Sequence, residues 1–280
     1  MAPYFKEAFR HVFSMGKKAA TLASSYYYSF HGSLYYTLAM KYATKLKNRL
    51  VRLIDAVHDK LLLIKYRNKP YFYYYRAVVD KRAIKDYQEA VGGQWEKNGI
   101  IQLERLKMYG LKPHHSLLDI GCGSLRGGVH LIGYLEKWNY MGIDISKDVL
   151  NAGRTVLKEN NLLTKEPTLI IATDLTLDYL GGRTFDYIHA QSVFSHMPQE
   201  DIEEYFSNLH KVMKPESQFY ASFFESKNGI YYPVYRMQDF YYPFSMFQDM
   251  ARKYGLEVER VADAKEGRKQ QLVRITVAKN

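Results

Sequence analysis

Three aspartates in the middle of the 280-residue sequence each lie at or next to the end of a short apolar run. Asp119 precedes a glycine-rich turn, Asp144 ends the run YMGID, and Asp174 ends the run TLIIATD. A carboxylate accepts hydrogen bonds, so Asp144 could bind both hydroxyls of a ribose and Asp174 the exocyclic amine of an adenine. The spacing therefore predicts an adenosine site built from successive strand ends.

The turn after Asp119 has the sequence GCGSLRGG, with four glycines between positions 121 and 128. Gly121 and Gly123 would let the chain turn sharply and let a ligand lie directly against the backbone. The helix expected next would offer its first N–H groups to an anionic or electron-rich ligand atom. Such a turn is a weak signal alone, and Asp144, 21 residues after Gly123, makes it stronger.

The glycine spacing argues against a nicotinamide-dependent dehydrogenase, which shares the turn and the ribose acid. The dehydrogenase fingerprint G-x-G-x-x-G, started at Gly121, needs a glycine where this chain has Arg126. No phosphate-binding lysine follows in the manner of a P-loop either. The sequence therefore favours a different adenosine-containing ligand.

Strand-like and helix-like segments alternate around these residues, which predicts an α/β fold with a doubly wound, mostly parallel, Rossmann-like sheet. The last two strands have a short connector and are expected to form an antiparallel edge hairpin, giving seven strands in all. The strands are expected at 116–121, 140–145, 168–174, 185–191, 217–224, 256–261 and 271–278, and the helices at 127–138, 147–160, 198–215 and 244–255.

Four segments resemble, in order, the motifs of class I S-adenosylmethionine (SAM)-dependent methyltransferases. They are LLDIGCGS, GIDIS, ATDL, and FDYIHAQSVFSHMP followed by LHKVMKP. The resemblance covers about residues 90–280 and implies SAM as the cofactor and methyl transfer as the reaction. The chain departs from the family pattern at the third glycine, where it has Leu125.

The resemblance also assigns roles to individual residues at the cofactor. Asp119 is expected to accept from the ammonium of SAM, directly or through water, and Arg126 to pair with its carboxylate. Asp144 is expected at the ribose and Asp174 at the adenine, with Asp178 as a near competitor for the adenine. The other residues expected to line the cofactor are Gly121, Cys122, Gly123, Ile145, Leu175 and Gln191.

His196 follows the fourth strand, where the transferred methyl group is expected to emerge. In the phosphoethanolamine methyltransferases and related small-molecule enzymes, a histidine at this spacing contacts the acceptor. By that resemblance His196 would accept a proton from a hydroxyl or ammonium acceptor, which suits an imidazole near neutral pH. The alternative is a histidine that only shapes the pocket. His189, inside the strand, is expected to be a core residue.

The acceptor is read mainly from what the sequence lacks. No Asn-Pro-Pro-Tyr or Asp-Pro-Pro-Tyr follows the fourth strand, so an exocyclic amine of a nucleobase or of glutamine is not indicated. The expected reaction is O- or N-methylation of a small-molecule, lipid or saccharide acceptor. The alternatives are an RNA methyltransferase and a non-catalytic SAM-binding scaffold. The aromatic run 231–244 is interpreted as an acceptor lid or as a hydrophobic plug.

Composition divides the chain at about residue 90. Residues 1–90 contain 17 Lys and Arg against 6 Asp and Glu, and 13 of the 26 tyrosines, whereas residues 91–280 contain 23 basic and 23 acidic residues. We therefore predict a basic, Tyr-rich helical N-terminal arm, residues 1–90, and a methyltransferase domain, residues 91–280. The helical pattern at 41–66 indicates packing on the main domain or contact with an anionic membrane surface, and less strongly a nucleic acid.

The expected location is the cytoplasm, with membrane association through the basic arm as an open alternative. The single cysteine, Cys122, excludes an internal disulfide framework and a cysteine-rich zinc site, and no metal is expected. No leucine-rich run follows Met1, so a secretory signal is not expected, although the basic N-terminus also suits a transit peptide. Residues 19–40 lack charge but contain five tyrosines and four serines, which favours a packed or interfacial segment over a membrane span.

Overall fold

The computed structural model describes residues 32–90, 93–226, 232–234, 239–261 and 270–279. The chain divides into two compact units, Met1–Leu61 and Leu62–Asn280. The second unit contains the sheet and all the strand-end residues singled out in the sequence.

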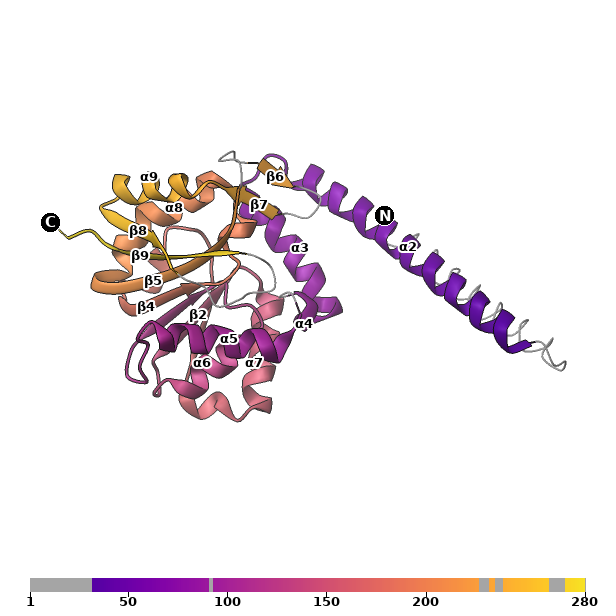
Figure 1. The fold of residues 1–280 in the computed structure, drawn as a ribbon, viewed down its shortest axis with the longest axis horizontal. Coiled ribbons are helices and arrows are strands. Elements are labelled where there is room, and N and C mark those ends of the chain that lie inside the picture. The colour runs from indigo at the N-terminus through magenta and orange to yellow at the C-terminus, as the bar shows by residue number, and fades with distance from the viewer. Residues whose placement is uncertain (1–31, 91–92, 227–231, 235–238, 262–269, 280) are drawn as a thin grey trace. The chain divides into compact units, whose positions relative to one another are not determined.

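The second unit is built on a central sheet with helices on both faces (Figure 1). Five strands run parallel because they alternate with helices, and β1 and β2 are buried along their whole length, as expected for strands covered on both faces. The last strand, β9, is antiparallel to both of its neighbours, β5 and β8. Across the sheet the order is β3 (Thr168–Ile171), β2 (Tyr140–Asp144), β1 (Leu117–Ile120), β4 (Phe185–Ala190), β5 (Met213–Glu225), β9 (Gln271–Val277) and β8 (Leu256–Arg260). The predicted doubly wound sheet with an antiparallel edge pair is confirmed.

Two short strands that the sequence did not predict extend the sheet beyond β5. β6 (Tyr232–Val234) and β7 (Asp239–Tyr242) form an antiparallel hairpin, and β7 pairs in parallel with the last residues of β5. They lie in the aromatic run that was interpreted as a lid or a plug. Pro233 lies in β6, the outer strand of the hairpin, where a missing N–H is tolerated. A proline in a sequence argues against a strand, so β6 was not predicted.

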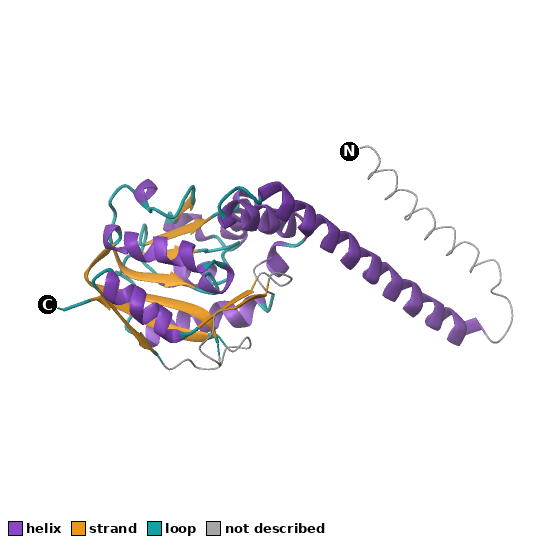
Figure 2. Cartoon of the chain, turned by 90° about the horizontal axis from the view of Figure 1, so that it is seen from above, coloured by secondary structure: helices purple, strands orange, loops and turns teal. Residues whose placement is uncertain are grey.

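Helices cover the sheet in two layers. α5 (Trp95–Met108), α6 (Gly128–Tyr134) and α7 (Lys147–Glu159) lie on one face, and α8 (Gln199–Asn208) and α9 (Phe244–Lys253) on the other (Figures 1 and 2). The short helices are α4 (Tyr87–Ala90) and the 3₁₀ turns η1 (Leu162–Lys165), η2 (Asp178–Leu180), η3 (Phe194–His196) and η4 (Leu209–Lys211).

Local signals fix the ends of two of these helices. Ser146 caps α7 by accepting from the backbone N of Val149 at 3.1 Å. α9 ends just before Gly255, whose φ of +68° is the left-handed conformation that terminates helices. The caps therefore set the position of both helices along the sheet.

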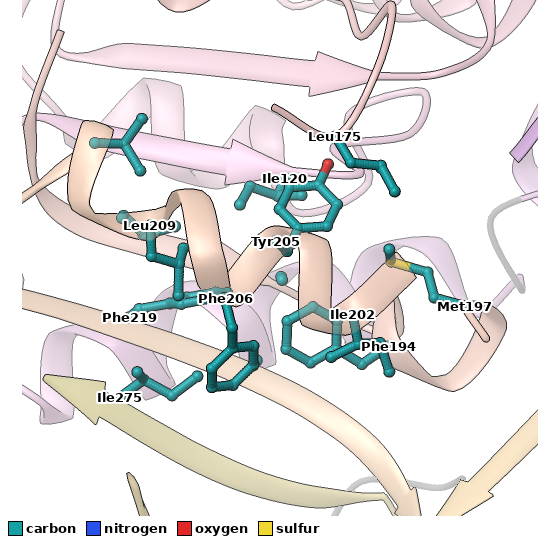
Figure 3. Close-up of a cluster of buried hydrophobic side chains, with 14 of the residues drawn as sticks. Ile120, Leu175, Phe194, Met197, Ile202, Tyr205, Phe206, Leu209, Phe219 and Ile275 are labelled. Atoms are coloured by element: carbon teal, nitrogen blue, oxygen red, sulfur yellow. The ribbon is translucent and has the colours of Figure 1, made fainter. Parts of the chain in front are cut away.

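The larger core lies between α8 and the sheet. Ile202 and Phe206 of α8 point toward Phe219 of β5, and Phe194 of η3 joins them (Figure 3). All four side chains are buried. Truncating a phenylalanine at such a site costs about 3–5 kcal/mol of stability. This core fixes η3, which carries His196, against the end of β4.

The compact unit starts earlier than the composition step suggests. α3 (Tyr71–Lys85) lies in the second unit, and its side chains Phe72, Tyr74 and Val78 are buried. The composition placed these residues with the basic arm, because the number of charged residues in a segment does not indicate which part of the protein the segment packs against.

The helix α2 (Gly32–Tyr66) accounts for the described part of the first unit. No helix among the described residues has the length and hydropathy needed to cross a bilayer. The uncharged run at 19–40 lies for the most part outside the described residues, since the structure describes only residues from 32 onward.

Candidate functional site

The glycine-rich turn after β1 alternates between left-handed and ordinary conformations. Gly121, Gly123 and Leu125 have φ of +66°, +60° and +71°. Leucine at the third position carries strain of about 1–2 kcal/mol there. The Leu125 side chain is fully buried, and this burial offsets the strain. It packs so closely on Gly128 that a Cβ added there would lie 2.6 Å from Leu125 Cδ2. The backbone therefore keeps the form of a three-glycine turn although the third glycine is absent.

Close packing surrounds the turn on both sides. A Cβ on Gly121 would lie 2.6 Å from Val193 Cγ2, and one on Gly142 would lie 2.8 Å from Cys122 Sγ. Burial, with Asp144 nearby, raises the pKa of the Cys122 thiol, which is therefore neutral near pH 7. Cys122 has the environment of a small turn residue and not of a nucleophile.

Asp119 lies under the turn in a buried hydrogen-bonded group. Its Oδ2 accepts from Tyr140 Oη at 2.7 Å, and its Oδ1 lies 3.3 Å from Nδ1 of His189. His189 is fully buried, which confirms it as a core residue. These contacts fix the orientation of Asp119 at the end of β1.

Asp144 is buried at the end of β2 and faces the same turn. Its Oδ2 accepts from Gly123 N at 3.0 Å and its Oδ1 from Ser146 N at 2.9 Å. Burial raises the pKa of Asp144 to about 6, although both backbone hydrogen bonds favour the ionised form. Each oxygen keeps a second acceptor position, so the carboxylate can still accept from two hydroxyls.

One cavity of about 610 Å³ brings the predicted site together. Arg126 lines it and donates from Nη1 to the carbonyl of Gly93 at 3.3 Å. Such a volume is typical of a small-molecule site. The predicted residues that line the cavity are Asp119, Gly121, Cys122, Gly123, Arg126, Asp144, Ile145, Leu175, Gln191 and His196.

Asp174 is the one predicted site residue that the structure does not place in the cavity lining. Its side chain is exposed and accepts from Thr173 Oγ1 and from the backbone N and hydroxyl of Thr176. The hydrogen bonds from Thr176 are the main cause that lowers its pKa. Ala172 and Leu175, on either side of it, do line the cavity. Contact between Asp174 and the adenine stays a prediction.

Sequence reasoning missed the helical wall of the cavity. Tyr71, Tyr75 and Arg82 line it from α3, and Asn98 and Gln102 line it from α5. The tyrosine run at 71–75 was visible in the sequence, but its composition did not indicate what it packs against. α3 therefore belongs to the site as well as to the compact unit.

The end of β4 is held by a polar network. Gln191 accepts from Arg105 Nη1 at 2.8 Å and donates from Nε2 to Ser222 Oγ at 2.9 Å. Ser222 Oγ in turn donates to Gln270 Oε1 at 2.7 Å. Ser192, with φ of +58°, is tied to the same network by its N–H. A strained residue that neighbours over-determine is typical of functional sites.

The far wall of the cavity carries a histidine and aromatic rings. His196 Nδ1 lies 3.4 Å from Asp239 Oδ1, and the His196 ring stacks on Tyr75 with centroids 5.5 Å apart and planes at 19°. Tyr241 and Phe224 also line this wall and stack on each other at 5.1 Å. The cavity lining thus adds a histidine and aromatic rings to the residues of the turn and the strand ends.

The sheet and the helices on its two faces define a Rossmann-like α/β domain. Among solved structures, the chain is similar to magnesium protoporphyrin IX methyltransferase from Synechocystis PCC 6803 with bound SAH. The TM-score is 0.57 at 15% identity, over 73% of this chain and 98% of that one. This likeness concerns the fold alone.

Sequence comparisons identify the domain. Residues 118–219 match the family model for a methyltransferase domain. The chain is 30% identical over 124 residues to an uncharacterised protein of Rickettsia prowazekii (strain Madrid E), which covers 42% of this chain and 47% of that protein. It is 27% identical over 109 residues to a probable methyltransferase of Aspergillus luteorubrus, which covers 38% of each. These matches span less than half the length of either relative. Residues 118–219 are therefore similar to a methyltransferase domain, and the motifs of this region resemble those of the class I enzymes, whose cofactor is SAM.

The chemistry of the cavity fits that cofactor. Asp144 offers a buried carboxylate to the ribose, and the glycines of the turn expose bare backbone beside it. Arg126 offers a cation suited to the carboxylate of the methionine part.

Proposed function

We propose that this chain transfers the methyl group of SAM to a hydroxyl or amine of a small-molecule, lipid or saccharide acceptor. The observation that carries the proposal is the convergence on one cavity of the turn, Asp144 and His196, which come from three different strand ends. The aromatic residues that line the same cavity support a binding place for the second substrate.

The residues of the chain mainly bind and align. When bound, SAM would supply an activated methyl group, and its sulfur would keep the electron pair of the methyl–sulfur bond that breaks. Asp144 would hold the ribose, Arg126 the carboxylate, and the glycine-rich turn the rest of the methionine part. Alignment and exclusion of water account for most of the rate enhancement in such a displacement. His196 takes the proton that the acceptor loses.

The cofactor site is tested by titrating dialysed protein with SAM in a calorimeter. Asp144→Ala should lose measurable binding, because the ribose hydroxyls lose their acceptor. Asp178→Ala is the matched control, since Asp178 is exposed, pairs with Lys211 and lies outside the cavity lining. Equal affinity of wild type and Asp144→Ala would reject the assigned site.

The acceptor class is tested by incubating the protein with SAM and a fractionated metabolite extract. A product heavier than its precursor by one CH₂ should form with wild type and not with Asp144→Ala. Tight SAM binding with no such product across small-molecule, lipid, saccharide and RNA fractions would favour a non-catalytic scaffold instead.

A second candidate activity concerns α2 alone. Its apolar residues at spacings of three and four are exposed, and basic residues flank them, which suits the surface of an anionic membrane. The exposed large apolar residues described for this helix are Tyr42, Leu46, Leu50, Leu53, Ile54, Val57, Leu61, Leu63 and Ile64. Pelleting with anionic vesicles but not neutral ones would support peripheral membrane contact. Salt-sensitive RNA binding without vesicle binding would favour RNA.

A further inference from the structure

His196 has a specific neighbour that no sequence motif indicated. Its Nδ1 lies 3.4 Å from Asp239 Oδ1, and the side chains of His196 and Asp239 are only 16% and 13% exposed. Both residues line the cavity. A carboxylate beside one ring nitrogen decides which nitrogen carries the proton.

The position of Asp239 is fixed by the strand on which it lies. Along β7, Asp239 and Tyr241 line the cavity, whereas Phe240 and Tyr242 are buried in the core, as the period of two in a strand requires. Tyr242 Oη donates to the carbonyl of Met197, the residue after His196. β7 is therefore attached directly to the turn that carries the histidine.

The plane of the histidine ring is fixed from the other side by α3. Tyr75 stacks on His196 at 5.5 Å, and Tyr71 stacks on Tyr75 at 6.1 Å. Tyr71 also meets the edge of Phe240 at 5.3 Å, so α3 is packed against β7 itself. Two independent elements thus hold one imidazole between a carboxylate and an aromatic ring.

We propose that Asp239 is the positioning residue of His196. It keeps the imidazole proton on Nδ1 and so leaves Nε2 as the nitrogen that accepts the acceptor's proton. The proton passes to Nε2 as the acceptor's lone pair forms the bond to carbon, and the resulting imidazolium faces the Asp239 carboxylate. The role of His196 in accepting a proton rests on the proposed function, whereas the contact between His196 and Asp239 does not.

The inference is tested by NMR of the full-length protein labelled with ¹⁵N in histidine, with His196→Gln to assign the signals. In wild type, neutral His196 should show a protonated Nδ1 and an unprotonated Nε2. Asp239→Ala should shift His196 toward a mixture of tautomers and lower the pH at which it becomes protonated, because the carboxylate favours the cation.

Asp239→Asn separates orientation from charge. Its amide oxygen can still accept from Nδ1–H, so the tautomer should be largely kept while the protonation midpoint falls. Glu96→Ala is the matched control, since Glu96 lies 3.8 Å from a different histidine, His130, and its loss should leave His196 unchanged.

Two results would overturn the inference. One is a wild-type His196 with its proton on Nε2, and the other is an unchanged tautomer and midpoint in both Asp239 variants. Because the NMR readout needs no SAM, it stays independent of the calorimetric test of Asp144. If the wild-type protein bound no SAM in the calorimeter but His196 kept its proton on Nδ1, the proposed function alone would be refuted.

Discussion

The carboxylate of Asp144 experiences two opposing effects in the same site. Burial disfavours its charge, whereas the N–H groups of Gly123 and Ser146 stabilise it, and the balance leaves a pKa of about 6. An ionised carboxylate is the form that accepts from both ribose hydroxyls. SAM binding should therefore depend on the ionisation of this group.

We predict that SAM affinity weakens about tenfold between about pH 7 and pH 5. The sign follows from the raised pKa, because the acid is protonated below pH 6 and ionised above it. Calorimetry across this range measures the effect in wild type and in Asp144→Asn, which should bind weakly without a step near pH 6. A flat profile for wild type would contradict the assignment.

Leu125 combines backbone strain with a buried side chain, and the two effects can be separated by mutation. Leu125→Gly relieves about 1–2 kcal/mol of left-handed strain but removes a side chain whose loss costs about 2–5 kcal/mol. We expect net destabilisation of about 1–3 kcal/mol, measured by urea unfolding. Gly123→Ala, which adds strain without removing packing, serves as the comparison. A stabilised Leu125→Gly protein would mean that strain dominates the turn.

At the scale of residues, the sequence predicted which residues at the strand ends reach the cavity. It did not predict contacts between residues far apart in the chain. Asp119, Asp144 and Gln191 reached the cavity because the carboxyl ends of parallel strands meet at one edge. Asp174 lies beyond the end of β3, which stops at Ile171, and two nearby threonines hold its carboxylate in a local turn. Nothing in the sequence relates Asp239 to His196, since their contact depends on the unpredicted β7.

At the scale of elements, Ser146 joins α3 to the start of α7. Its hydroxyl accepts from Val149 N as the cap of α7 and donates to Asp80 Oδ1 of α3. Its backbone N–H donates to Asp144. One small residue therefore connects α3, which lines the cavity, with Asp144.

We predict that Ser146→Ala lowers stability by about 1–3 kcal/mol, because it removes a helix cap and a buried partner of Asp80. Asp80→Ala should cost less, since it leaves the cap in place. Urea unfolding of both variants and of the double variant measures the two contributions. SAM affinity should change little in Ser146→Ala, because the N–H to Asp144 is retained, and a large loss would show that the hydroxyl acts on the site.

Several elements with clear periodicity or end signals were predicted from the sequence, whereas the 14-residue helix α5 and the short strands β6 and β7 were not. α9 and its terminal Gly255 follow the expected pattern, as does the antiparallel pair of β8 and β9. β6 and β7 have three and four residues, too few for an alternating pattern, and they become strands only through pairing with β5. Their formation is a tertiary effect.

At the scale of the whole molecule, charge and packing divide the chain at different places. The basic excess ends near residue 90, whereas the compact unit begins at Leu62. α3 is rich in tyrosine and basic residues, yet it buries Phe72, Tyr74 and Val78 and lines the cavity with Tyr71 and Tyr75. The residues between 62 and 90 thus belong to the second compact unit by packing.

This difference predicts opposite outcomes for two truncations. A chain of residues 62–280 should unfold cooperatively and bind SAM with the affinity of the full chain, because it keeps every residue that lines the cavity. A chain of residues 91–280 should lose more than about 3 kcal/mol of stability or fail to fold, because the loss of α3 uncovers its buried partners. Thermal unfolding followed by circular dichroism, with SAM calorimetry, measures both. Equal stability and affinity of the two truncated chains would place the boundary at the composition step and make α3 dispensable.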